Sequence, residues 1–347
     1  MKDTIQIAVI GAGANTKLHH IPKLQSQKGV HIIGVCNRTR ESSQSVAFQF
    51  NIPKIYSHWL EAVEDPEADA VVIGTWPYLH ARAAAAALEA GKHVLTEARM
   101  ASTAGEARMM YEAAQKRPDL TVQIVPAPFS LGFDHTIRRL LSEGYVGELM
   151  LVEHAASFPF PERDAPMHWR QDRDLSGFNI AMLGIYYETI MRWIGVASRV
   201  SAMTRVFIRR RPDSTGIMRT VEVPDHVDVI AEMACGAQLR MQQSLARVFR
   251  NHDDGIWLHG DEGVLRFHDG KLFGARRGYQ ELQEITVLPQ ERIGWRVEEE
   301  FIGSIRGTEN VVYTRFEDGV KYMEFTEAVS RSAAQRRQVV LPLELDA

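Results

Sequence analysis

Short apolar runs and amphipathic segments alternate along the first 125 residues of the chain. The apolar runs predict strands, and the segments between them have the 3.6-residue period of helices. Strands are predicted at 5–10, 30–36, 70–74, 93–96 and 121–125, and helices at 17–26, 40–50, 79–90 and 103–116. Gly91 is placed as a C-terminal cap, and Thr103 with Glu106 predicts a capping box. This alternation predicts a doubly wound parallel sheet.

The pattern changes after Pro126 and Pro128, where strands with strict polar–apolar alternation become dominant. Val227 and Val229 fall on one face of such a strand, which is typical of an antiparallel sheet covered on one side. Strands are predicted at 148–157, 200–208, 227–234, 238–245 and 339–343, and helices at 134–142, 179–193 and 319–335. We therefore expect an α/β protein with a parallel domain at 1–125 and a second domain at 126–347, whose last helix returns toward the first.

Composition and charge argue against several classes of binding partner, namely nucleic acids, membranes and metal ions. The chain has 347 residues and a formal charge of −4, without the basic excess of a nucleic-acid-binding protein. No apolar run approaches the roughly 20 residues that span a bilayer, and no signal peptide precedes the first strand. The isolated Cys36 and Cys235 indicate a reducing compartment, so a cytoplasmic location is expected. No cluster has metal-site spacing: the adjacent His19 and His20 would face different directions on a helix.

A dinucleotide-binding motif follows the first predicted strand. The segment from Gly11 to Thr16 has glycines at the first two fingerprint positions, Gly11 and Gly13, and opens a helix whose N-terminus would face a pyrophosphate. Ala14 and Asn15 complete this turn, whereas Thr16 replaces the third glycine. The context of strand, turn and helix is what supports the motif.

The end of the second predicted strand concerns the choice of cofactor. NAD-binding domains usually place an acidic residue there, on the adenine ribose. This chain instead has neutral Asn37 with Arg38 and Arg40 beside it, which suits a 2′-phosphate. The alternative is that both arginines point into water at a helix start. We expect NADP(H) to be preferred, with NAD(H) possible.

Further segments resemble those of the glucose–fructose oxidoreductase / inositol dehydrogenase / rhizopine catabolism family (Gfo/Idh/MocA). They are the strand and turn at 71–80, the helix and strand at 87–97, and the turn at 144–148. The resemblance implies that Thr75, Trp76, His80 and Glu97 lie near the cofactor. It also implies a Rossmann domain followed by a domain with a large open sheet, which often serves as a subunit interface. We therefore expect a homodimer or homotetramer, all the more if the open face is apolar.

Departures from the family pattern concern the catalytic residues. The family's Glu-Lys-Pro tripeptide appears here as Glu97-Ala98-Arg99, so its lysine is lost. On the helix of the second domain, Met182 and Tyr186 replace the family's aspartate and histidine. In one interpretation Tyr186 carries the proton and the guanidinium of Arg99 lowers the pKa of its phenol. In the other, the site has lost its redox chemistry.

The loop before this helix favours an active enzyme, because it is rich in groups that can act on a substrate. His168 is a further catalytic candidate, and Trp169, Arg170, Asn179 and Met182 are candidates for substrate binding. The resemblance thus implies an NADP(H)-dependent oxidoreductase acting on a sugar, cyclitol or related polyol. Two alternatives stay open: a nucleotide- or sugar-binding regulator without turnover, and a lyase or hydrolase that oxidises its substrate transiently.

Overall fold

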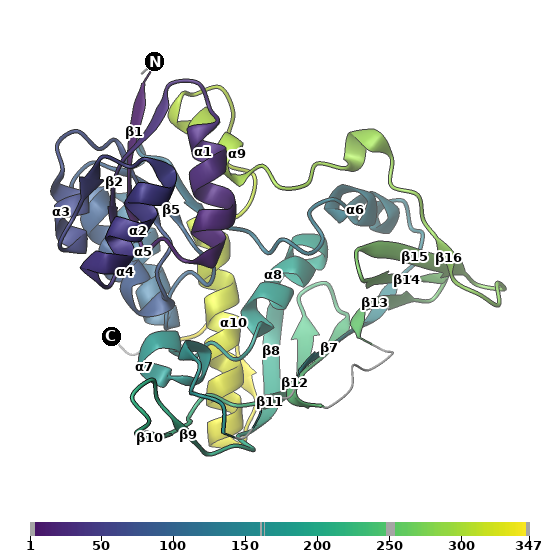
Figure 1. Ribbon diagram of the computed structural model, residues 1–347. Coiled ribbons are helices and arrows are strands. Elements are labelled where there is room, and N and C mark those ends of the chain that lie inside the picture. The colour runs from purple at the N-terminus through teal and green to yellow at the C-terminus, as the bar shows by residue number, and fades with distance from the viewer. Residues whose placement is uncertain (1–3, 160–161, 163, 248–253, 345–347) are drawn as a thin grey trace. The chain divides into compact units, whose positions relative to one another are not determined.

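The computed structural model describes residues 4–159, 162, 164–247 and 254–344 (Figure 1). The chain forms two compact units. Unit one comprises Met1–Pro126 and Arg296–Met323, and unit two comprises Ala127–Trp295 and Glu324–Ala347.

Unit one contains a six-stranded parallel sheet with the order β3-β2-β1-β4-β5-β6. Its strands are β1 (Ile5–Ile10), β2 (Val30–Cys36), β3 (Lys54–Ile55), β4 (Ala70–Ile73), β5 (His93–Thr96) and β6 (Val122–Ile124). The intervening helices are the π-helix η1 (Thr16–His20), α1 (Ile21–Gln25), α2 (Arg40–Phe50), α3 (Trp59–Glu64), α4 (Pro77–Glu89) and α5 (Ala104–Gln115). Every residue of β4 is buried, as expected for a central parallel strand with both faces covered. The predicted doubly wound sheet is confirmed.

Two helix ends follow the predicted cap chemistry in part. Gly91 has a φ of 78°, which suits its place after the end of α4. The Thr103 side chain accepts the Glu106 amide at 3.1 Å, but the Glu106 carboxylate accepts the amide of Ser102 and not that of Thr103. The reciprocal half of the capping box is therefore displaced by one residue.

Thr16 replaces the third glycine of the fingerprint, and a glycine at the end of the neighbouring strand makes room for it. A Cβ at Gly74, directly after β4, would lie 2.1 Å from Thr16 Oγ1 and 2.2 Å from the carbonyl oxygen of Gly11. Thr16 in turn donates its hydroxyl to the Gly11 carbonyl at 3.3 Å. Glycine at position 74 thus provides the close helix–strand packing that the third fingerprint glycine usually allows.

Residues 296–323, which the sequence assigns to the second domain, pack within unit one. They form α9 (Val297–Ile305) and the start of α10 (Phe316–Gln335). Ile124 and Thr314 exchange backbone hydrogen bonds of 2.9 and 3.2 Å, which completes the edge of the sheet beside β6. Long-range pairing of this kind carries no local sequence signal.

Unit two is built on a nine-stranded sheet with the order β16-β15-β14-β13-β7-β12-β11-β8-β17. Its strands are β7 (Leu149–Pro159), β8 (Ala197–Arg205), β11 (His226–Met233), β12 (Gln238–Arg247), β13 (Gly255–Gly260), β14 (Gly263–His268), β15 (Lys271–Arg276), β16 (Gln283–Glu284) and β17 (Val339–Val340). Strands β9 (Arg210–Pro212) and β10 (Met218–Thr220) form a separate hairpin. All neighbours in the large sheet are antiparallel except β7 and β12. The predicted mostly antiparallel sheet is confirmed.

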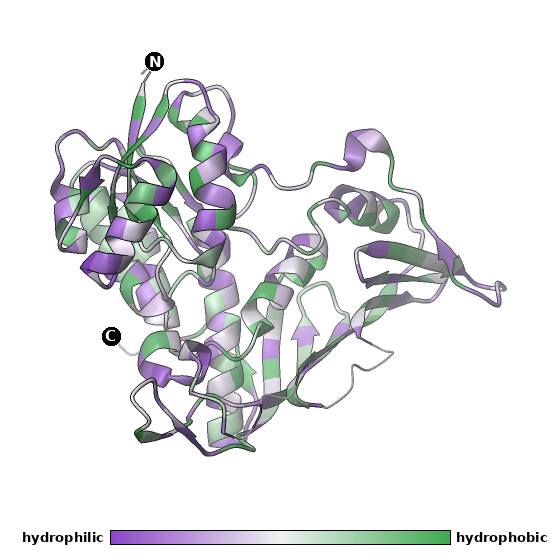
Figure 2. Ribbon diagram, viewed as in Figure 1, coloured by the Kyte–Doolittle hydropathy of each residue, from purple (hydrophilic) through white to green (hydrophobic). Residues whose placement is uncertain are grey.

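The two faces of this sheet differ in polarity, and hydrophobic and hydrophilic residues alternate along its strands (Figure 2). Val227 and Val229 of β11 are buried, whereas Ile230 on the opposite face is 54% exposed. Unit two also contains α6 (Asp134–Ser142), η2 (Trp169–Gln171), α7 (Arg173–Ser176), α8 (Leu183–Ile194), η3 (Pro289–Glu291) and the end of α10.

Candidate functional site

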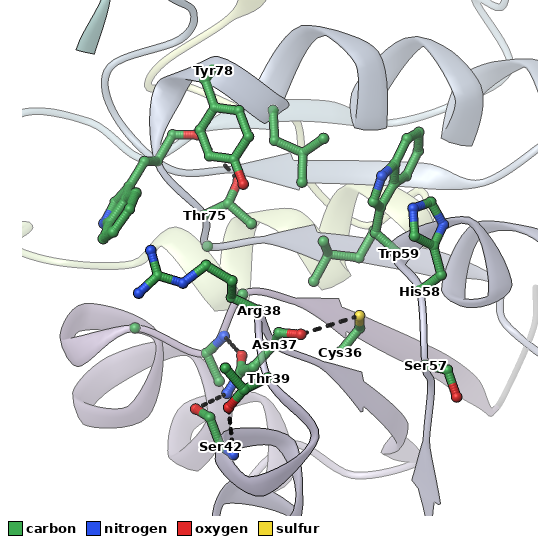
Figure 3. Close-up of a pocket in the computed structure, with 17 residues that line it drawn as sticks. Cys36, Asn37, Arg38, Thr39, Ser42, Ser57, His58, Trp59, Thr75 and Tyr78 are labelled. Atoms are coloured by element: carbon green, nitrogen blue, oxygen red, sulfur yellow. Dashed lines mark hydrogen bonds between the residues drawn. The ribbon is translucent and has the colours of Figure 1, made fainter. Parts of the chain in front are cut away.

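A cavity of about 440 Å³ opens in unit one at the carboxyl ends of β1, β2 and β4 (Figure 3). In a doubly wound sheet with this strand order, that edge is where a dinucleotide binds. The lining residues are Ile10, Gly11, Ala12, Gly13, Cys36, Asn37, Arg38, Thr39, Ser42, Ser57, His58, Trp59, Gly74, Thr75, Trp76, Tyr78 and Leu79.

The glycine turn forms the floor of this cavity. Gly11 has a φ of +83°, and a Cβ there would lie 2.5 Å from Thr75 Cγ2, so only glycine fits. The amide of Ala12 donates to Asn37 Oδ1 at 2.7 Å, which ties the turn to the end of β2. The helix that follows begins immediately after Gly13, and the first amides of a helix lack intrahelical partners. These groups fit a pyrophosphate.

The turn between β2 and α2 provides the cavity's polar side. Asn37 Nδ2 donates to Ser42 Oγ at 2.9 Å, and the Thr39 side chain caps α2 by accepting the Ser42 amide at 3.2 Å. The Arg38 guanidinium carbon lies 5.1 Å from the centroid of the Trp76 ring. None of the lining residues is Asp or Glu. The wall therefore offers a cation, hydroxyls and a helix N-terminus without a carboxylate.

The structure brings together only part of the predicted cofactor set. The residues that line the cavity are Gly11, Gly13, Asn37, Arg38, Thr75 and Trp76; those that do not are Ala14, Asn15, Arg40, His80 and Glu97. The cavity is also lined by four residues that were not predicted: Ser42, Tyr78, His58 and Trp59. Of these four, only Ser42 could have been predicted, because it lies three residues after the Thr39 cap in the first turn of α2. His58 is the N-cap of α3 and Trp59 is its first residue, and no local motif marks them as cofactor ligands.

His80 connects two backbone segments. Its side chain is fully buried, with Nε2 2.9 Å from the Thr75 carbonyl oxygen and Nδ1 2.9 Å from that of Arg99. Burial lowers the pKa of His80, while the contacts with these carbonyl oxygens and the charge of Glu97 act in the opposite direction. Arg99 is itself buried, at 1% exposure. Arg99 belongs to unit one and Tyr186 to unit two, and their pairing remains a prediction.

Tyr186 of unit two is held between two aromatic rings. Its ring centroid lies 4.5 Å from that of Phe129 and 4.2 Å from that of His154, with interplanar angles of 12° and 28°. Two nearly parallel rings at such distances must cover opposite faces of the phenol ring. Burial lowers the pKa of His154 to about 4, so this partner is uncharged. The two stacked rings therefore fix the plane of the phenol ring.

The helix carrying Tyr186 begins later than predicted. α8 starts at Leu183, Met182 is its N-cap, and Asn179 precedes it, so the predicted start at residue 179 is wrong. Ala181 has a φ of +43°, which is incompatible with helix, and the Met182 amide donates to Gln243 Oε1 at 3.0 Å. The buried Asn179 donates its side-chain amide to the Ser176 carbonyl at 2.6 Å.

The loop of substrate candidates makes mostly local contacts. His168 caps η2 by accepting the Arg170 amide at 3.2 Å, and the Arg170 guanidinium carbon lies 4.2 Å from the centroid of the Trp169 ring. Burial, with a smaller effect from Arg170, lowers the pKa of His168. These contacts cover one face of Trp169, and the proposed substrate roles of the three residues remain predictions.

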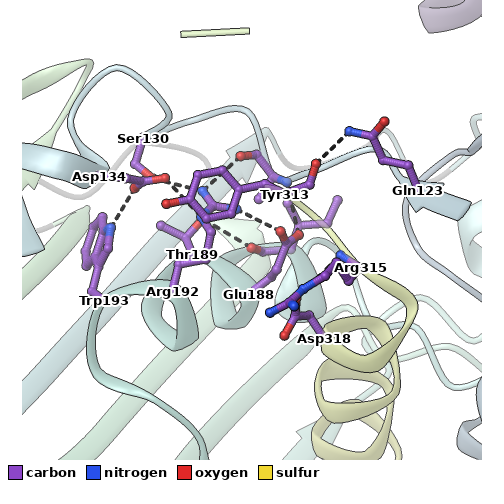
Figure 4. Close-up of polar contacts among 12 residues, drawn as sticks. Gln123, Ser130, Asp134, Glu188, Thr189, Arg192, Trp193, Tyr313, Arg315 and Asp318 are labelled. Carbon is purple, nitrogen blue, oxygen red and sulfur yellow. Dashed lines mark hydrogen bonds and ion pairs between the residues drawn. The ribbon is translucent and has the colours of Figure 1, made fainter. Parts of the chain in front are cut away.

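Arg192 lies near the end of α8 and binds two buried carboxylates. It donates from Nε to Asp134 at 3.0 Å and from Nη1 to Glu188 at 2.7 Å, and all three side chains are buried (Figure 4). The indole of Trp193 donates to the other Asp134 oxygen at 2.6 Å. This cluster joins α6 to α8 and so supports the helix that carries Tyr186.

The described residues contain no group of three or more His, Cys, Asp or Glu that could hold a metal ion. Within the same ranges, no helix is both long and apolar enough to cross a membrane.

Comparison with known proteins links both units to one family. Residues 5–124 match the model described as "Oxidoreductase family, NAD-binding Rossmann fold", and residues 135–266 match the "GFO/IDH/MocA C-terminal domain". An uncharacterized oxidoreductase of Synechocystis sp. is 28% identical in an alignment of 302 positions that covers 82% of this chain and 79% of that protein.

Levoglucosan dehydrogenase is similar to this chain both in amino-acid sequence and in three-dimensional structure. The enzyme of Pseudarthrobacter phenanthrenivorans is 25% identical in an alignment of 297 positions that covers 76% of this chain and 73% of the enzyme. A solved structure described as levoglucosan dehydrogenase in complex with NADH and L-sorbose has a TM-score of 0.84 at 22% identity, covering 98% of this chain and 99% of that one. With its NAD(P)-binding Rossmann unit and matching second unit, the chain belongs to the GFO/IDH/MocA oxidoreductase family.

Proposed function

We propose that this protein is an NADP(H)-dependent oxidoreductase that passes a hydride to or from a sugar, cyclitol or related polyol. The observation that carries the proposal is the chemistry of the unit-one cavity: a glycine turn and a helix start for a pyrophosphate, beside a wall without carboxylates. The sugar part rests on relatives, since levoglucosan dehydrogenase and inositol 2-dehydrogenase are named for such substrates.

The preference for the 2′-phosphate rests on this chain's own residues, because the structural neighbour is described with NADH. Arg38 brings a cation that is always charged, and Ser42 and Thr39 bring hydroxyls at the N-terminus of α2. An acidic residue at position 37 would repel a phosphate, whereas Asn37 is neutral. Each of these features favours NADP(H) over NAD(H).

The bound nicotinamide would accept or donate the hydride at its C4 carbon. Tyr186 Oη is the group that would give or take the proton at the substrate oxygen. Phe129 and His154 fix the plane of its ring, which limits the positions of that hydroxyl. The always-charged Arg99 would lower the pKa of the phenol toward working pH. His168, Trp169 and Arg170 would contact the substrate.

Turnover of NADPH with a panel of sugar, cyclitol and polyol substrates, and of NADP⁺ with their reduced forms, tests this proposal. With the best substrate, Tyr186→Phe should lower turnover by about 10²–10⁴-fold while NADPH affinity changes by less than about threefold. Tyr187→Phe is the matched control: its hydroxyl is buried, accepts the Ala197 amide at 2.7 Å, and should be needed for stability only. A loss below about fivefold for Tyr186→Phe would assign this residue to packing and make His168 the next candidate.

The two other functions are separated by the same assays. Tight cofactor binding without turnover on any substrate would indicate a regulator. Net elimination or hydrolysis without a net change in cofactor absorbance would indicate transient oxidation.

The open sheet face of unit two is our proposed contact between subunits. The expected apolar face is not what the structure has: Ile230 and Met203 are exposed there, but charged pairs such as Arg199 with Glu232 lie around them. A face of mixed polarity suits a non-obligate interface, because such interfaces are about as apolar as the rest of a protein surface. We propose a homodimer or homotetramer, and a monomeric mass by light scattering at micromolar concentration would refute it.

A further inference from the structure

His20 lies fully buried in unit one between two carboxylates. Its Nδ1 is 2.6 Å from Glu298 Oε1, and its Nε2 is 3.0 Å from Glu97 Oε1. An ionised carboxylate can only accept hydrogen bonds, so both ring nitrogens donate and the imidazole carries a proton. Burial alone lowers the pKa of His20, but hydrogen bonds and charge from Glu298 and Glu97 outweigh it and raise the pKa to about 9.

Glu298 holds the His20 ring on the side away from Glu97, by accepting a hydrogen bond from Nδ1. It lies in the first turn of α9, where the helix dipole favours a negative charge, and its side chain is fully buried. Its second oxygen is 3.8 Å from Lys23 Nζ. Because Glu298 has no access to solvent, its contribution is to hold the His20 ring and its proton in place.

Glu97 differs from Glu298 in having one oxygen to spare. Its Oε1 accepts from Asn15 Nδ2 at 2.5 Å and from His20 Nε2 at 3.0 Å. Its Oε2 has no hydrogen-bond partner within the described part of the chain, and the side chain is 14% exposed. Although burial alone would raise the pKa of Glu97, His20 and Asn15 lower it, so the carboxylate is ionised. The cluster thus presents a single fixed acceptor at its surface.

The place of Glu97 in the sheet indicates what this acceptor meets. Glu97 follows β5, and its amide donates to the Ile73 carbonyl at the end of β4. In a sheet of order β3-β2-β1-β4-β5-β6, the end of β2 serves the adenine nucleotide and the β4–β6 half serves the second nucleotide. That second nucleotide carries ribose hydroxyls and a carboxamide NH₂, all of which are donors.

We propose that His20 is the positioning residue for the nicotinamide half of the cofactor site, where it holds Glu97 so that Oε2 accepts a hydrogen bond from a hydroxyl or amide of the nicotinamide nucleotide. The inference rests on the proposed cofactor function and adds to it a residue that does not itself line the cavity. The π-helical turn of η1, which is five residues long, is the segment that carries His20 inward.

Two substitutions at position 20 separate its two hydrogen bonds. In His20→Gln the side-chain amide reaches as far as Nε2 and keeps a donor for Glu97. In His20→Asn it replaces only Nδ1 and keeps a donor for Glu298. We expect NADPH affinity to fall by about 10- to 100-fold in His20→Asn, in the range of one lost charged hydrogen bond, and by less than about threefold in His20→Gln.

A probe that lacks the nicotinamide nucleotide distinguishes a positioning role of His20 from a purely structural one. Adenosine 2′,5′-bisphosphate occupies only the adenine half, so its affinity should change by less than about twofold in both variants. Glu97→Gln should weaken NADPH alone, and adding His20→Asn to it should cause little further loss, because His20 acts through Glu97. Lys23→Ala, at a partly exposed side chain, is the control and should leave both affinities unchanged.

Several results would overturn the inference. Equal weakening of both ligands in His20→Asn would assign His20 to the general stability of the Rossmann unit. Unchanged NADPH affinity in His20→Asn and Glu97→Gln would show that Oε2 does not meet the cofactor. If His20→Asn does not fold, Glu298→Gln tests the same point with little change of shape, and unchanged NADPH affinity there would also count against the inference. Failure of the unchanged protein to bind either NADPH or NADH would instead overturn the proposed function, and this inference with it.

Discussion

Removing the charge of Arg192 should destabilise unit two more than the loss of any exposed ion pair would. The Arg192 side chain is 5% exposed, and those of its partners Asp134 and Glu188 are 0% and 1% exposed. Arg192→Met keeps most of the side-chain volume but leaves two buried carboxylates without their cation. Breaking a buried pair in this way costs about 3–5 kcal/mol, mostly as the penalty of uncompensated buried charge.

The assay is the free energy of opening of α6 and α8, measured by hydrogen exchange with mass spectrometry, since the two units need not unfold together. Lys271→Met is the control: Lys271 pairs with Glu284 at 2.9 Å, but both are more than half exposed, and its loss should cost below about 1 kcal/mol. Adding Asp134→Asn and Glu188→Gln to Arg192→Met should recover part of the loss. A cost below about 1 kcal/mol for Arg192→Met would refute the reasoning, because the carboxylates would then be solvated or protonated at little expense.

Two further predictions concern unit one. The pKa of His20 is raised in the folded state from its ordinary 6.5 to about 9, so the stabilisation from its charge is complete below about pH 6.5 and is lost as the pH rises through 9. Urea unfolding should show a fall of about 3 kcal/mol over this window, and a flat profile would contradict the buried imidazolium. Gly74→Ala should cost about 1–3 kcal/mol in thermal unfolding, because its Cβ would lie 2.1 Å from Thr16 Oγ1, and Thr16→Gly should restore part of that stability. Full stability of Gly74→Ala alone would show that the turn has room to adjust.

The parallel sheet and its helices could be predicted from the sequence because each element has a pattern within its own short segment. Buried parallel strands are continuous apolar runs, and α2 was predicted with its observed bounds, Arg40–Phe50. In unit two the alternation of β11 and β12 was equally clear, but β13, β14 and β15 were missed. These strands mix glycine, charge and aromatic residues, as in Arg266 packed over Trp257, so their period is weak.

The site was predictable where it follows a motif, and not where it depends on tertiary contacts. Gly11, Gly13 and Arg38 come from the fingerprint and from the end of β2, and they do line the cavity. His20 was set aside as one of two adjacent histidines on a helix, yet it is buried while His19 is only partly buried. Its partner Glu298 lies 278 residues further along the chain, a distance over which no pattern in a single sequence connects them.

The measurement that tests the account most directly is a calorimetric titration of the unchanged protein with NADP(H) and with NAD(H) at one salt concentration. We predict tighter binding of NADP(H), by at least about tenfold, which corresponds to one or more charged hydrogen bonds to the 2′-phosphate. Asn37→Asp with Arg38→Ala should reverse this preference, and the fold tolerates it because an aspartate still accepts the Ala12 amide at the position of Asn37 Oδ1. Equal or tighter binding of NAD(H) by the unchanged protein would contradict the assignment of the cavity to a 2′-phosphate.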